Sequence, residues 1–105
     1  MIPYINFVEP INDDVAKRLM NLCSELWNQQ KPGRIVFLFS SPGGFINPGV
    51  SLYNFFQAFP CEITMHNIGN IDSSAVIVFL AGNRRLASPS SSFLMHGVTW
   101  NYGSG

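Results

Sequence analysis

Hydrophobic and polar positions follow two kinds of pattern along this chain. RIVFLF, at residues 34–39, is a continuous β-prone run without polar alternation. Such a strand is buried on both faces, which is typical of a parallel sheet. The looser alternation YINFV at residues 4–8 predicts a first strand, and CEITMHNI at about 61–68 and SFLMHGV at 92–98 predict two more.

Helical signals lie between the predicted strands. Asn12 can cap a helix whose apolar residues recur at intervals of four, three and four, and KPG at residues 31–33 ends it. Two further helices are predicted over residues 50–59 and 73–81, the second of them buried. NRRLASPSSS, at residues 83–92, predicts a polar turn or hairpin.

This order of elements, β-α-β-α-β-α-β, predicts a single α/β domain over residues 1–105 with right-handed crossovers. Hydrophobic residues make up 47% of the chain and charged residues 11%, against about 25% charged in typical domains. So few charges predict extra buried surface, through self-association or within a larger assembly. Six basic and six acidic residues cancel, so neither nucleic acid nor an anionic membrane is an expected partner.

The two cysteines and the apolar runs bear on the compartment. Cys23 and Cys61 lie 38 positions apart with no CxxC pair, which favours free thiols in a cytosolic protein over a secreted disulfide. The start MIPYINFVEP lacks the pattern of a signal peptide, and the longest apolar run, residues 75–81, is far below the ~20 residues of a membrane span. We expect a soluble protein of the cytoplasm, or of an organellar stroma or matrix, with neither metal nor cofactor.

Candidate chemistry begins with SPGG, which follows the predicted strand 34–39. Pro42 fixes one backbone dihedral, whereas Gly43 and Gly44 permit positive φ and the close approach of another backbone. The motif fits a tight turn, or a loop that presents a backbone N–H to an oxyanion or a peptide strand.

A second candidate is the serine pair in GNIDSSAVIVFLAG, residues 69–82. Ser73 stands at the mouth of a predicted buried helix, where exposed amides and the helix dipole favour developing negative charge. The alternative is that Ser73, Ser74 or Asp72 only caps the helix.

A third candidate is His96 in FLMHG, at the end of an apolar strand. A lone histidine there is usually structural, and His66 is interpreted so. A Pro-Gly-Gly loop, a serine at a helix mouth and a histidine that ends a later strand nevertheless follow one another in the order Gly44, Ser73, His96.

These motifs together resemble those of the proteolytic subunit of the Clp protease (ClpP), a family of serine peptidases. The family's NSPGG loop is matched by residues 40–44, its GQAASMGA segment by residues 69–76 and its MIHQ by residues 94–97. The helix start INDDVA, residues 11–16, is also similar. The resemblance covers essentially the whole chain. It implies a ClpP/crotonase-like spiral of β-β-α units with mostly parallel strands, incomplete at the C-terminal end.

The resemblance also implies roles for individual residues. Ser73 matches the nucleophile and His96 the general base, and the backbone N–H groups of Gly44 and Ser74 match the oxyanion hole. Ser74 replaces a methionine, which makes the pocket wall more polar. Asp72 stands where the family usually has alanine, and its carboxylate can repel the developing oxyanion unless the side chain turns away.

The implied function is that of a serine endopeptidase subunit acting on peptides or unfolded proteins, as a homo-oligomeric ring with an ATPase unfoldase. The family completes its triad with an acid after the histidine, whereas no Asp or Glu follows Asp72 here. We therefore expect the front part of such a subunit, with little activity on its own. A non-catalytic Clp-like subunit or assembly module is the alternative.

Two other enzyme classes share part of the pattern. Signal peptide peptidases carry an SPGG-like loop but use a lysine base, and no lysine follows Lys31. Crotonase-type enzymes share the spiral architecture and a two-amide oxyanion hole, yet need no serine and histidine at these places.

Overall fold

The computed structural model describes residues 1–95 and 98–102, with side chains through residue 95. It has one six-stranded sheet and three helices. In chain order the elements are β1 (Tyr4–Val8), α1 (Asp13–Gln30), β2 (Arg34–Ser41), α2 (Ile46–Ala58), β3 (Glu62–Asp72), α3 (Ser74–Leu80), β4 (Arg84–Ala87), β5 (Ser91–Met95) and β6 (Val98–Tyr102). The predicted α/β class and parallel sheet are confirmed.

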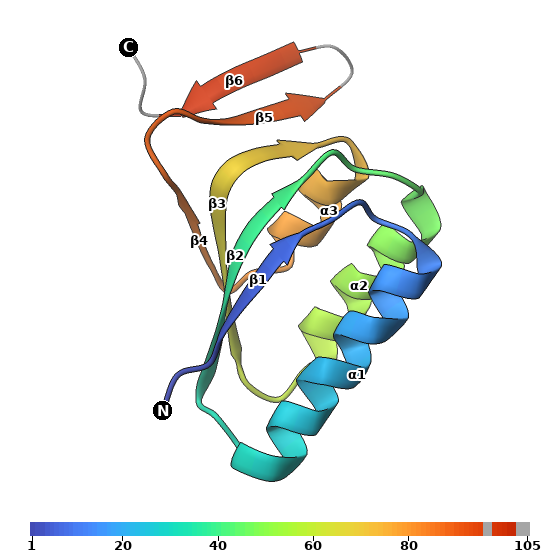
Figure 1. Ribbon diagram of the computed structural model, residues 1–105, viewed down its shortest axis with the longest axis vertical. Helices are drawn as coiled ribbons and strands as arrows, with labels where there is room; N and C mark the ends of the chain where they lie inside the picture. Colours follow the sequence, from blue (N-terminus) through green and yellow to red (C-terminus); the bar gives the residue numbers. More distant parts are fainter. Residues whose placement is uncertain (96–97, 103–105) are drawn as a thin grey trace.

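Strand β3 is the centre of the sheet, and its pairing partner changes along its length. β1, β2 and β3 are parallel neighbours. On its other edge, β3 pairs with β4 over residues 64–67 and then with β5 over residues 70–72, both in parallel. β6 returns antiparallel to β5, and this hairpin lies across the far end of the sheet (Figure 1). The partner changes between residues 67 and 70, and the pairing with β5 ends immediately before Ser73.

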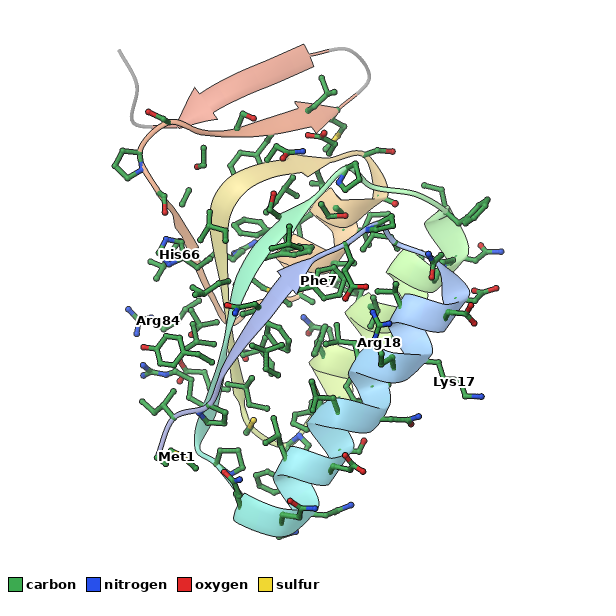
Figure 2. The ribbon with its side chains drawn as sticks, viewed as in Figure 1. Met1, Phe7, Lys17, Arg18, His66 and Arg84 are labelled. Atoms are coloured by element: carbon green, nitrogen blue, oxygen red, sulfur yellow. The ribbon has the colours of Figure 1, made fainter. Side chains whose placement is uncertain are left out.

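The core lies between the sheet and the two longer helices, α1 and α2, which cover the same side of the sheet (Figure 1). Figure 2 shows the side chains that fill this space, among them Phe7 of β1. Phe7 packs edge-on against Phe39 with ring centroids 5.0 Å apart, and Phe37 packs against Phe56 at 5.2 Å. Each buried phenylalanine contributes about 2 kcal/mol. The loops at the strand ends therefore stand on a rigid base.

Helix α1 confirms the predicted capping. Asn12 Oδ1 accepts a hydrogen bond from the Val15 N–H at 2.8 Å, which satisfies one free donor of the first turn. Lys31 adopts left-handed dihedrals (φ 47°) and ends the helix by donating its N–H to the Trp27 carbonyl. In the part of the chain that the structure describes, no helix is long and apolar enough to cross a membrane.

Several predicted boundaries were wrong. Residues 84–87 form strand β4 rather than a turn or hairpin, and residues 98–102 form an additional strand, β6. β4 is a short strand of mostly exposed residues that begins with two arginines, so it has no apolar run to signal it. β3 continues past its predicted end at about residue 68 to Asp72, and α2 begins four residues before Val50, at Ile46.

Candidate active site

Ser73 occupies the single residue between β3 and α3, and its backbone is strained. Its φ of 53° and ψ of −123° are rarely adopted by residues other than glycine and cost roughly 1–3 kcal/mol. The turn is held from both sides, because the Ser73 N–H donates to the Leu94 carbonyl at 2.8 Å and the Ser73 carbonyl accepts from the Val76 N–H at 3.0 Å. The side chain of Ser73 is exposed and makes no capping hydrogen bond to α3. Helix capping therefore does not explain Ser73.

The SPGG loop lies directly against this turn. Gly43 has φ 87°, and a Cβ atom there would lie 3.0 Å from the Ser73 Cβ and 2.5 Å from the Asp72 carbonyl oxygen. Gly43 also donates its N–H to Ser41 Oγ at 3.1 Å, which fixes the loop. Only glycine fits at this contact.

Gly44 connects the loop to the segment that follows β1. The Ile11 N–H donates to the Gly43 carbonyl at 2.9 Å, and the Phe45 N–H donates to the Ile11 carbonyl at 3.0 Å. Successive N–H groups of extended backbone point to opposite sides, so the Gly44 N–H faces away from Ile11. The Gly44 N–H is therefore not used in the pairing with Ile11, as its predicted oxyanion role requires, and its direction toward a substrate stays a prediction.

A pocket of about 210 Å³ opens beside the nucleophile candidate. Apart from two serine hydroxyls its lining is apolar, and it comprises Ile46, Ser73, Ser74, Val76, Ile77, Leu80 and Met95. Ser74 is 1% exposed, and its Oγ has no hydrogen-bond partner among the described residues. Such a pocket fits one uncharged side chain of a bound peptide.

The Asp72 carboxylate has a hydrogen-bond partner on its own strand. Its Oδ2 accepts a hydrogen bond from Asn70 Nδ2 at 2.9 Å, so the carboxylate is held by the preceding part of β3. Asn70 in turn contacts Ser40 at the end of β2. Sequence reasoning missed Asn70 and Ser40, because no motif links two residues that meet only through strand pairing.

The structure brings together three of the four predicted site residues. Ser73 and Ser74 are consecutive at the start of α3, and Gly44 follows Gly43, which contacts the Ser73 turn, whereas the predicted base His96 lies outside the described residues. His66 lies elsewhere on β3, with its Nε2 2.9 Å from Ser88 Oγ, as its structural interpretation requires. In the described part of the chain, no three His, Cys, Asp or Glu side chains are grouped so as to hold a metal ion.

Neither cysteine competes with Ser73 as a nucleophile. Burial, with a smaller contribution from the nearby Cys61, raises the pKa of Cys23 from its ordinary value of 9.0 to about 12. The pKa of Cys61 is also raised, by burial and then by the charge of Glu62. Both thiols are free and stay protonated at neutral pH.

Comparison with known proteins gives consistent matches. The family model described as Clp protease matches residues 3–102. ATP-dependent Clp protease proteolytic subunit 2 of Mycolicibacterium paratuberculosis is 34% identical over 91 residues, covering 82% of this chain and 44% of that protein. ATP-dependent Clp protease proteolytic subunit 1 of Chlamydia felis is 30% identical over 90 residues, which cover 84% of this chain and 42% of that protein. The chain thus spans less than half the length of these relatives.

Two solved structures have a similar fold. ClpP1 from Listeria monocytogenes superposes with a TM-score of 0.79 at 16% identity, covering 86% of this chain and 54% of that one. The ClpP protease catalytic domain from Plasmodium falciparum also superposes with a TM-score of 0.79. Its sequence identity is 24%, and the match covers 88% of this chain and 53% of that one. These two matches support the predicted architecture.

Proposed function

This chain belongs to the Clp protease family, and we propose that it is a serine endopeptidase subunit in which Ser73 is the nucleophile and His96 the general base. The observation that carries the proposal is the strained, exposed Ser73 packed against the Gly43–Gly44 loop. A non-glycine residue in such a conformation is retained at functional sites, where it aims a side chain at the reacting group.

The proposed reaction is acyl transfer. His96 accepts the hydroxyl proton as Ser73 Oγ attacks the peptide carbonyl carbon, and the backbone N–H groups of Gly44 and Ser74 stabilise the oxyanion. His96 then donates the proton to the departing amine, and water hydrolyses the acyl-enzyme. Because only its amide serves the oxyanion hole, Ser74 can replace the family's methionine.

The proposed substrates are peptides or unfolded proteins with an uncharged, mainly apolar side chain before the scissile bond. No charged residue lines the pocket beside Ser73, so a charged side chain there would be desolvated without a partner. We also propose a homo-oligomeric ring that works with an ATPase unfoldase in the cytoplasm, or in an organellar stroma or matrix. The relatives' names include "ATP-dependent", which agrees with such a partner.

Covalent labelling tests the nucleophile directly. The 105-residue chain is incubated with a fluorophosphonate, and the labelled residue is identified by mass spectrometry. We expect label on Ser73, its loss in Ser73→Ala, and nearly complete loss in His96→Ala. Ser90→Ala is the matched control, because Ser90 is also exposed with positive φ. Equal labelling of Ser73→Ala would place the nucleophile elsewhere.

Steady turnover by the chain alone is expected to be very slow. Removing the acid of a serine-histidine-acid triad costs on the order of 10⁴ in turnover, and no acid follows Asp72 in this sequence. Labelling needs one covalent event, so it is the more sensitive readout. Robust peptide turnover that disappears in Ser73→Ala would show that an acid within the chain, such as Asp72 or Glu62, completes the triad.

A non-catalytic Clp-like subunit or assembly module is the second candidate. The aspartate beside Ser73, where the family usually has alanine, favours it. This second candidate predicts that the folded chain leaves Ser73 unlabelled at every reagent concentration. The chain should still associate with itself or with another Clp-type subunit.

A further inference from the structure

The carboxylate that immediately precedes Ser73 is held by a neighbouring amide. Asn70 and Asp72 are two residues apart on β3, and Asn70 Nδ2 donates a hydrogen bond to Asp72 Oδ2 at 2.9 Å. Asn70 precedes Asp72, whereas Ser73 follows it. The hydrogen bond therefore ties the carboxylate to the residue that precedes it on β3 rather than to the nucleophile candidate.

The orientation of the Asn70 amide is set by β2. Ser40 Oγ accepts from the Asn70 N–H at 3.2 Å, and its one proton has two acceptors within reach, Asn70 Oδ1 at 3.1 Å and the Asn70 backbone carbonyl at 3.2 Å, of which Oδ1 is the nearer. With its carbonyl oxygen engaged by the hydroxyl, the amide presents its NH₂ group to Asp72. The Ser41 carbonyl is a more distant acceptor of the same group, at 3.5 Å.

A strand irregularity makes room for this contact. Phe39 pairs with Asn67 and Ser41 pairs with Ile71, so two steps along β2 correspond to four along β3. Asn70 lies in the extra segment, where regular ladder hydrogen bonds are interrupted. Its side chain therefore occupies a position that regular pairing would not provide.

The charge of Asp72 is adverse to the proposed reaction. Attack by Ser73 creates an oxyanion one residue away from a carboxylate, and like charges at such distances destabilise each other. Asp72 is only partly exposed, so solvent screens its charge less than on an open surface. An uncharged donor such as Asn70 disperses this charge and keeps it away from Ser73.

We infer that Asn70 is a positioning residue for the chemistry of Ser73 and that it acts through Asp72. This inference rests on the proposed function, because it presumes that negative charge develops at Ser73. It implies that the chain retains the aspartate only together with the asparagine that holds it.

A double-mutant cycle tests the inference on the 105-residue chain. The rate constant of fluorophosphonate labelling at Ser73 is measured for wild type, Asn70→Ala, Asp72→Ala and the double variant, at equal folded fraction by circular dichroism. We expect Asn70→Ala to lower the rate about tenfold, since the freed carboxylate approaches the oxyanion. Asp72→Ala should label at least as fast as wild type, and the double variant within about twofold of Asp72→Ala.

The cycle separates positioning from a structural role. If the double variant is as slow as Asn70→Ala, Asn70 supports the strand irregularity and the inference is wrong. Slower labelling of Asp72→Ala than of wild type would also overturn it, because Asp72 would then assist the reaction. If wild type itself takes no label at Ser73, the proposed function fails and the inference fails with it.

A second set of variants covers the case in which Asn70→Ala does not fold. Ser40→Ala leaves Asn70 in place but removes the hydroxyl that orients its amide, so it should slow labelling by a smaller factor. Asp72→Asn keeps the size of the side chain and removes its charge, and in the Ser40→Ala background it should restore the rate. Absence of that rescue would contradict the inference.

Discussion

Gly43 and Ser73 are packed so closely that a methyl group on the glycine would lie 3.0 Å from the Ser73 Cβ. The same methyl group would lie 2.5 Å from the Asp72 carbonyl oxygen, closer than real Cβ contacts. The loop after β2 and the turn after β3 therefore determine each other's position. A change in the loop must move the nucleophile candidate, although the two lie 30 positions apart.

Gly43→Ala should consequently lower Ser73 labelling by at least about tenfold, since small displacements of reacting groups are costly. It should also reduce the free energy of unfolding by about 1–3 kcal/mol, because alanine is strained at φ 87°. Gly33→Ala is the matched control, because a Cβ atom there meets nothing within 4 Å. Labelling rates and urea denaturation check both effects, and an unchanged rate in Gly43→Ala would show that the contact does not position Ser73.

The strain at Ser73 predicts a gain of stability when the residue is replaced by glycine. Ser73→Gly should be about 1 kcal/mol more stable than Ser73→Ala, because only glycine adopts φ 53° without strain. Neither variant should label. Ser90→Gly relieves a similar positive φ of 70° away from the site and should keep normal labelling. Equal melting temperatures for Ser73→Gly and Ser73→Ala would mean that the turn carries no strain.

The sequence predicted the elements that have strong periodicity or a clear cap. β2 was predictable because residues 35–39 form an unbroken apolar run, and α1 because Asn12 precedes regular apolar spacing. β4 and β6 were missed. The formation of β4 depends on pairing with β3 rather than on its own residues, since Arg84 and Arg85 carry no strand signal.

The site was predictable to the same degree. The glycine pair and the serine before a buried helix have local signatures, so Gly44, Ser73 and Ser74 could be named from the sequence. The hydrogen bonds of Asn70 with Ser40 and with Asp72 could not be predicted from the sequence, because they depend on an irregular strand register. The role of His96 stays a prediction.

Cys23 predicts a loss of stability in alkaline solution. In the unfolded chain its thiol ionises near its ordinary pKa of 9.0, whereas burial raises the folded-state pKa to about 12. Between these values the unfolded state binds fewer protons, so the free energy of unfolding falls as pH rises, by up to about 1.4 kcal/mol per pH unit. Below pH 9 the Cys23 thiol is protonated in both the folded and the unfolded state, so the stability that depends on the neutral thiol is fully present.

Cys23→Ala is the variant that isolates this effect. Urea denaturation from pH 8 to 11 should give a shallower decline of stability for Cys23→Ala than for wild type, whatever the offset caused by the smaller side chain. The half-buried Cys61 contributes in the same direction, since its pKa is also raised. Parallel pH profiles for the two proteins would contradict the burial of the Cys23 thiol.

The sheet face that α1 and α2 leave uncovered predicts self-association. Figure 2 shows His66 and Arg84 on this side of the sheet, away from α1. Strand register places exposed Tyr4 and Leu86 on the same face, 66% and 42% exposed. With only 11% charged residues in the chain, few charges oppose contact between two such faces. Sedimentation velocity should therefore give a weight-average mass that rises above 11.7 kDa with concentration.

Charged substitutions on this face should reverse the association. Each of Tyr4→Lys and Leu86→Lys desolvates a charge within the contact and should weaken association by about tenfold or more. Leu22→Lys is the matched control, because Leu22 is 40% exposed but lies on α1, on the opposite side of the sheet. If Leu22→Lys dissociates the protein and the two strand variants do not, the helical side carries the contact. A wild-type chain that stays monomeric at every concentration would show that the low charge fraction does not drive association, because the exposed apolar side chains are too scattered to form an interface.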